Sequence, residues 1–197
     1  MFKKTSSAVL GGVVLGLLST STMAVEFMDA TWAKQACAAW NKDAVLTEKL
    51  AQMPEDMFGE GYQWIKNDAG RSYKIITLSR DGCKAPKVQL NIAEKNGKAM
   101  CIYGGKLDGK ELNMAVDYYM HATDADWTCM GGKWEWETNK KRKRKLVSAP
   151  RCGVMGSMMT GKLKFAGPKM EAMKVMDPFA NFLKLTGKVA ATKTACK

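Results

Sequence analysis

The residues best suited to catalysis are few and scattered. His121 is the single histidine, which excludes metal sites built from several histidines and weakens any Ser-His or Cys-His scheme. The segment from Gly156 to Lys162 matches the GxxxxGK pattern of a phosphate-binding loop, but Leu163 stands where a Ser or Thr must hold Mg²⁺. We therefore expect a protein that is not an enzyme and that uses no cofactor, metal or nucleotide.

Methionine is abundant, with 15 residues in the chain. Met170, Met173 and Met176 recur at a spacing of three, and thioethers are soft ligands suited to Cu(I) in an exported protein. The stripe runs on into Phe179 and Phe182, which bind no metal, so it also fits an apolar helix face that packs or contacts a ligand. We favour the apolar face, and the copper site stays open as an alternative.

The N-terminus predicts export. Lys3 and Lys4 precede an apolar run over residues 8–18, and a small, polar stretch ends at Ala24. This order is typical of a secretory signal peptide cleaved after residue 24, and the run is too short to span a bilayer. We expect residues 1–24 to be removed, leaving a single domain over residues 25–197 in the periplasm or outside the cell.

All six cysteines follow the predicted cleavage site. An even number in an exported chain predicts up to three disulfides, whose pairing the sequence does not fix. The absence of a CxxC motif argues against a redox pair, a zinc site or haem attachment. The cysteines are Cys37, Cys83, Cys101, Cys129, Cys152 and Cys196.

The formal net charge of +12 favours acidic partners, and export makes nucleic acid the least suitable of them. A basic run follows two tryptophans, which suit a lipid interface. Either the run is a solvated loop, or it docks on an anionic membrane or an acidic periplasmic protein. These docking candidates are Trp134, Trp136, Lys140, Lys141, Arg142, Lys143, Arg144 and Lys145.

The elements that must position these residues differ along the chain. Apolar residues spaced by four predict a helix over residues 29–53 that stops at Pro54, with a break at residues 41–43. Alternating segments then predict about five strands, over residues 62–66, 71–79, 88–93, 98–107 and 112–121. Asn96-Gly97 is a hairpin turn, and consecutive hairpins make an antiparallel meander.

The last third returns to helices. Residues 124–127 resemble a helix start with acidic residues in its first turn. A strand over residues 162–166 and a helix over residues 169–185 follow, the helix restarting with Asp177 as N-cap and Pro178 at its first position. Gly187 is expected to end it. The sequence thus predicts an α+β fold.

Within this third, the segment from Met158 to Gly167 and the run Ala172-Met173-Lys174 resemble the sterol carrier protein type 2 family. The order of the predicted elements is also similar to that family's. The stretch around residues 129–152 looks like an insertion. Pro168 and Lys169 stand where the family usually has one or two polar residues, so the terminal helix is expected at a different angle.

The resemblance implies an antiparallel sheet with helices at both ends that enclose an apolar cavity. It implies a non-catalytic protein that holds a fatty acid, phospholipid, sterol or isoprenoid lipid. The alternative is an accessory subunit that binds an exported enzyme through its basic surface. The candidate cavity wall is Met159, Leu163, Phe165, Met170, Met173, Met176, Phe179, Phe182 and Leu183.

Overall fold

The computed structural model describes residues 25–59, 62–66, 68, 70–136, 144–147 and 151–194. The predicted signal peptide, residues 1–24, lies outside the described residues. The N-terminal helices are α1 (Ala30–Trp40), the π-helical η1 (Val45–Lys49) and α2 (Leu50–Phe58). The strands are β1 (Tyr73–Arg80), β2 (Val88–Lys95), β3 (Lys98–Lys106), β4 (Tyr118–Ala122), β5 (Lys133–Trp136), β6 (Arg144–Val147) and β7 (Lys164–Ala166). The later helices are α3 (Asp124–Gly131), α4 (Val154–Met159), α5 (Lys169–Lys174) and α6 (Met176–Lys188).

The main sheet has five strands in the order β3-β2-β1-β4-β7, and the predicted α+β class is confirmed. The predicted continuous meander is wrong in one place, because β4 pairs in parallel with β1. A parallel partner requires a crossover instead of a hairpin. Residues 107–117 form it and pass over the face of the sheet that carries Gln89, whose side-chain oxygen accepts a hydrogen bond from the Asp108 amide at 3.4 Å. The strand predicted over residues 112–121 accordingly begins at Tyr118.

The hairpin between β2 and β3 is as predicted. Asn96 and Gly97 both have positive φ, 54° and 71°, as a two-residue hairpin turn requires. The strand predicted over residues 62–66 is wrong: this segment is irregular and sends Trp64 into the core, where its indole N–H donates to the Tyr118 hydroxyl at 3.0 Å.

The predicted first helix is divided. Asp29 caps α1 by accepting a hydrogen bond from an amide of the first turn, and the expected break occurs at residues 41–43. Pro54 does not stop the helix, which continues to Phe58. Because α2 begins at Leu50, the missing N–H of Pro54 leaves only the first carbonyl of this helix without its partner. Gly59, with φ of 97°, ends α2 instead.

The predicted C-terminal helix also divides, into α5 and α6. The second part begins at Met176, one residue before the expected cap. Gly187 does not end α6, which runs to Lys188. A Cβ on Gly187 would lie 2.3 Å from the Gly131 carbonyl oxygen, so this glycine lets α6 pack closely on α3.

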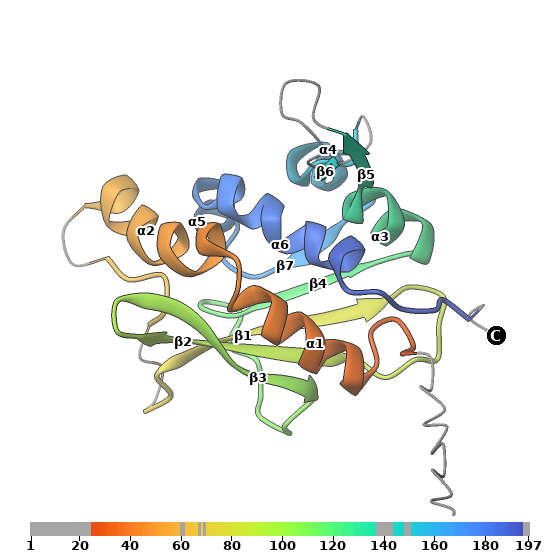
Figure 1. The fold of residues 1–197 in the computed structure, drawn as a ribbon. Coiled ribbons are helices and arrows are strands. Elements are labelled where there is room, and N and C mark those ends of the chain that lie inside the picture. The colour runs from red at the N-terminus through yellow and green to blue at the C-terminus, as the bar shows by residue number, and fades with distance from the viewer. Residues whose placement is uncertain are drawn as a thin grey trace, which may run out of the picture.

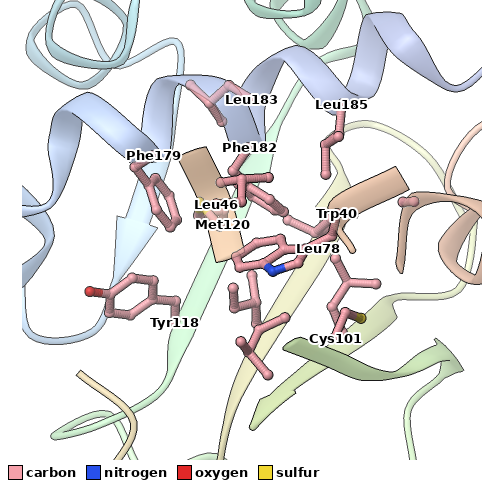
Figure 2. Close-up of a cluster of buried hydrophobic side chains, with 14 of the residues drawn as sticks. Trp40, Leu46, Leu78, Cys101, Tyr118, Met120, Phe179, Phe182, Leu183 and Leu185 are labelled. Carbon is pink, nitrogen blue, oxygen red and sulfur yellow. The ribbon is translucent and has the colours of Figure 1, made fainter. Parts of the chain in front are cut away.

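The core lies between the sheet and the helices α1 and α6 (Figure 1). Trp40 of α1 meets Phe182 of α6 edge to face, with ring centroids 5.6 Å apart. Leu78 and Met120 lie beneath them on neighbouring strands (Figure 2). The two helices therefore share one face of the sheet.

Two of the predicted disulfides are present. Cys37–Cys101 joins α1 to β3, and Cys129–Cys152 joins the end of α3 to the chain just before α4. The second bridge closes the segment predicted to be an insertion. Cys83 is disulfide-bonded as well, and Cys196 lies outside the described residues. Among the helices that the structure describes, none has the length and apolar character needed to cross a bilayer.

Candidate functional site

The helix-covered face of β1 carries two buried cations, Lys74 and Arg80, on either side of Ile76 and Leu78. Alternate residues of a strand share a face, so all four point toward the helices. A buried charge is costly unless it is paired and hydrogen-bonded. The two cations meet this requirement with different partners, and the set around Lys74 is the candidate site.

The partner of Lys74 is Glu171 of α5, whose carboxylate is buried like the lysine. Lys74 Nζ donates to Glu171 Oε1 at 2.6 Å, and the Tyr118 hydroxyl donates to the same oxygen at 2.8 Å. The other oxygen, Oε2, accepts a hydrogen bond from the Tyr62 hydroxyl and lies 3.5 Å from Lys66 Nζ. We call these five residues the Glu171 cluster.

Two aromatic rings enclose the Lys74 ammonium. Its Nζ lies 4.3 Å from the Tyr118 ring centroid and 4.8 Å from that of Trp64, in cation–π range. The hydrogen bond from Trp64 to the Tyr118 hydroxyl fixes the two rings relative to each other. The cation is therefore held by ring faces as well as by a carboxylate.

Burial and charge shift the titration of this cluster. Burial lowers the pKa of Lys74 to about 8, against the opposing effect of Glu171. Burial also raises the pKa of Tyr62 and of Tyr118, and the Glu171 carboxylate adds to the rise. Both tyrosines therefore stay protonated and act as donors at neutral pH.

A second ion pair fixes the strand end beside the cluster. Arg71 donates to both oxygens of Asp117, at 2.9 and 2.8 Å. The Asp117 carboxylate also accepts from the amide of Ile75 in β1 at 2.8 Å. Because Asp117 immediately precedes Tyr118, this pair fixes the start of β4, the strand that carries Tyr118.

A cleft of about 250 Å³ opens beside the cluster, between α2, the segment 62–65 and the β2–β3 hairpin. We call it the α2 cleft. Leu50 and Trp64, both buried, contribute apolar lining together with Ala51 and Ile65, and polar residues such as Glu94 line it as well. Tyr62 belongs to both structures, since it lines the cleft and its hydroxyl donates to Glu171.

The nine residues predicted as a cavity wall divide into three groups. Leu163, Phe179, Phe182 and Leu183 are buried in the core, and Figure 2 shows the last three on the face of α6 toward the sheet. Phe165 and Met176 are half-buried. Met159, Met170 and Met173 are exposed. Two of the aromatic residues share a neighbour. The rings of Phe165 and Phe179 both pack on the Tyr118 ring, with centroid distances of 5.0 and 5.5 Å.

The predicted docking residues belong to the β5–β6 hairpin. Trp134 and Trp136 lie on β5, and Arg144 and Lys145 on β6, with Trp136 opposite Arg144 in the register. In Figure 1 this hairpin stands apart from the main sheet, near α4. Residues 140–143 lie outside the described residues, so docking by the basic run stays a prediction.

His121 takes part in a group of ionic contacts around Asp81. Its Nδ1 lies 2.6 Å from Asp81 Oδ1, and Lys164 Nζ donates to the other oxygen of Asp81 at 2.8 Å. The nearby Ser79 hydroxyl is hydrogen-bonded to Tyr119. Within the described part of the chain, no group of three or more His, Cys, Asp or Glu side chains could hold a metal ion.

Comparison with solved structures aligns two of them with most of this chain. One, a hypothetical protein from Thermus thermophilus described as possibly a sterol carrier protein, is 12% identical with a TM-score of 0.45, over 87% of this chain and 97% of the other. The second, named UbiJ-SCP2 ubiquinone synthesis protein, is 10% identical with a TM-score of 0.38, over 78% and 89%. No protein-family model and no curated protein matches the sequence.

The first name mentions the sterol carrier proteins, and the second contains the label SCP2. At these identities and TM-scores, the likeness says nothing about a ligand of this chain. A site in this chain has to be argued from its own residues.

Sequence reasoning missed the residues of this site. Lys74 stands directly before Ile75 and Ile76 in a strand, and a lysine on the buried face of a strand demands an anionic partner. The sequence therefore indicates that Lys74 has an anionic partner, but it does not indicate which residue that partner is. Glu171 sits among methionines in a short helix nearly a hundred residues later, and only the fold brings the two together.

Proposed function

We propose that the protein binds an apolar or amphipathic lipid in the α2 cleft and performs no chemistry on it. The observation that supports this most directly is the lining of the cleft. Its deep residues Leu50 and Trp64 are apolar and buried, while its other lining residues include charged and amide side chains. The polar lining residues are Gln52, Glu55, Tyr62, Gln63 and Glu94. A concave site with apolar walls and polar groups that orient the ligand is the usual form of a small-molecule site.

The size of the cleft narrows the ligand class. Its volume of about 250 Å³ is below the ~300–1,000 Å³ common for ligand pockets. This favours one acyl or prenyl chain over a sterol ring system or a two-chain phospholipid. Apolar area removed from water contributes ~25 cal/mol per Å², so a short chain gains several kcal/mol without specific polar contacts.

We infer further that the lipid is bound outside the cytoplasm. The predicted signal peptide supports this, as does the disulfide bonding of every cysteine in the described residues. Intact-mass measurement of protein from cells expressing the full chain tests the proposal. The expected mass is that of residues 25–197 less six hydrogens, and retention of residues 1–24 contradicts export.

Filling the cleft tests the binding site. Ala51→Trp places an indole in the α2 cleft and is expected to abolish binding of decanoic acid and 1-decanol in calorimetric titration. Ala180→Trp is the matched control, because Ala180 is also partly buried but lines a separate groove between α4 and α6. Equal loss in both variants, or no loss in Ala51→Trp, contradicts the assignment of the cleft.

Native mass spectrometry of the purified protein tests lipid binding itself. We expect a bound lipid, or uptake of added single-chain lipids by emptied protein. A lipid-free protein that copurifies with one acidic partner supports the accessory-subunit alternative. Copper(I) binding that disappears when Met170, Met173 and Met176 are changed to Leu supports the copper alternative.

A further inference from the structure

Helix α5 has its polarity inverted. Its exposed side chains include Met170 and Met173, which are 67% and 48% exposed, whereas Glu171 is 3% exposed. A surface helix normally buries its apolar residues and exposes its charges. The arrangement is stable here only because the Glu171 carboxylate reaches donors that the interior already holds.

Those donors fill the acceptor capacity of one carboxylate, since its two oxygens offer about four lone-pair sites. Four groups from β1, β4 and the segment 62–66 converge on a single carboxylate, and two of them, Lys74 and Lys66, are ammonium groups. The Glu171 cluster therefore carries two positive charges against one negative charge. It has the composition of a binding site for an anion, and the chain supplies the anion itself.

The two oxygens of Glu171 differ in access. Oε1 meets the buried donors Lys74 and Tyr118, while Oε2 meets Tyr62 and Lys66, which are both partly exposed. Tyr62 also lines the α2 cleft. A molecule lying in the cleft thus reaches the outer donors of the cluster first.

We propose that Glu171 occupies the site for the carboxylate of the ligand, and that a single-chain carboxylic acid displaces it when its chain enters the α2 cleft. This inference rests on the proposed function and specifies its ligand class. In the exchange, the ligand carboxylate takes the hydrogen bonds from Tyr62 and Lys66 and then those from Tyr118 and Lys74. Glu171 leaves with α5, and its carboxylate becomes hydrated.

The surroundings of α5 suit such a movement. The helix has six residues, is preceded by Pro168, and is separated from α6 at Val175. It is attached to the C-terminal end of α2, where Lys174 Nζ donates to the Met57 carbonyl oxygen at 3.2 Å and lies 3.8 Å from the Phe58 ring centroid. The helix that carries the resident carboxylate therefore borders the helix that forms the cleft.

Titration with decanoate and 1-decanol, which share one chain, tests the exchange. Glu171→Gln removes the resident anion, so the affinity for decanoate is expected to rise about tenfold, as when a competing state populated at about 90% is removed. The affinity for 1-decanol is expected to change less than twofold. Lys66→Met is expected to weaken decanoate binding several-fold and to leave 1-decanol unchanged.

Lys169→Met is the matched control for Lys66→Met. Lys169 is an exposed lysine of α5, the helix that carries Glu171, and lies outside the cluster. It loses the same charge and is expected to change neither affinity. An unchanged or lower decanoate affinity in a folded Glu171→Gln variant overturns the inference, as does tighter binding of decyl phosphate than of decanoate. If Glu171→Gln does not fold, an unchanged decanoate affinity in Lys66→Met decides against it.

The two proposals fail differently. If the unaltered protein binds neither decanoate nor 1-decanol, the proposed lipid binding in the α2 cleft is wrong. If it binds both, and no variant of the cluster separates them, lipid binding stands and the carboxylate site is wrong.

Discussion

The two ends of β1 bury a cation in different ways. At one end Arg80 makes two hydrogen bonds of 2.6 Å to Asp124, and its third side-chain nitrogen reaches Glu26 at 2.7 Å. At the other end Lys74 shares one carboxylate, Glu171, with a second ammonium and two hydroxyl groups. Two carboxylates therefore bind one guanidinium at the Arg80 end, whereas two ammonium groups meet one carboxylate at the Lys74 end.

This difference distinguishes a structural clamp, formed by Arg80 and its partners, from a candidate binding site around Lys74. The Arg80 guanidinium also donates to the carbonyl oxygens of Phe27 and Thr194, so it joins β1 to α3 and to both terminal segments. Its pKa is raised, first of all by the hydrogen bonds to Asp124. The pKa of Lys74 is lowered by burial. The Arg80 guanidinium thus holds parts of the fold together. The buried Lys74 ammonium, by contrast, loses hydration energy that its partners do not fully replace, and it lies beside a cleft.

The largest expected effect is at the clamp. Arg80→Met leaves Asp124 and Glu26 without their cation and is expected to cost about 3–5 kcal/mol of unfolding free energy, measured by urea denaturation. Hydrogen exchange should quicken first at residues 25–27 and 192–194, which the guanidinium ties down. Arg80→Lys is expected to recover only part of the loss, because an ammonium cannot bind Asp124 through two nitrogens. A loss below about 1 kcal/mol would show that the clamp is dispensable.

At the Lys74 end, a single substitution is expected to lower the free energy of unfolding more than the substitution of both members of the ion pair. Lys74→Met alone leaves Glu171 buried without its main partner and should cost about 3 kcal/mol. Lys74→Met combined with Glu171→Met should restore most of this, because replacing both members of a buried pair by apolar groups is often nearly neutral. Denaturant unfolding of the four members of this cycle gives the coupling. A double variant as unstable as the single one would mean that the pair is needed for the fold.

Local patterns in the sequence predicted most of the elements. The first helix, the turn at Asn96-Gly97 and the strand from Val88 depend on residues close in the chain, and the structure contains all three. The errors lie where distant contacts decide. Residues 62–66 look like a strand, but burial of Trp64 against Tyr118 holds them in an irregular path.

The candidate site was less accessible to sequence reasoning. The methionines at 170 and 173 suggested a buried stripe, yet Glu171 between them turns inward because Lys74 and Tyr118 lie beneath it. Helical periodicity favours burying the methionines, and the free energy of pairing a buried lysine outweighs it. Such a reversal depends on which strand face lies under the helix, which no local pattern records.

The smallest expected effect is a dependence of stability on pH that only one end of β1 produces. Between pH 8 and the usual lysine pKa of 10.5, the unfolded chain binds a proton at Lys74 that the folded chain has released. Stability must therefore rise with pH across this window, by about 1–2 kcal/mol between pH 7 and 9.5. The raised pKa values of Tyr62 and Tyr118 act in the opposite sense, but only above their usual value of 10. The charged groups that act on Lys74 are Glu171, Lys66 and Asp117.

Arg80 stays charged throughout this range, so its end of the strand adds no such slope. The difference in unfolding free energy between the unaltered protein and the Lys74→Met, Glu171→Met double variant isolates the lysine from the remaining titrating groups, including Lys193. We expect this difference to shift in favour of the unaltered protein as the pH rises from 7 to 9.5. A difference that is constant with pH would mean that burial does not lower the pKa of Lys74. The two ends of the strand would then hold their cations in the same way.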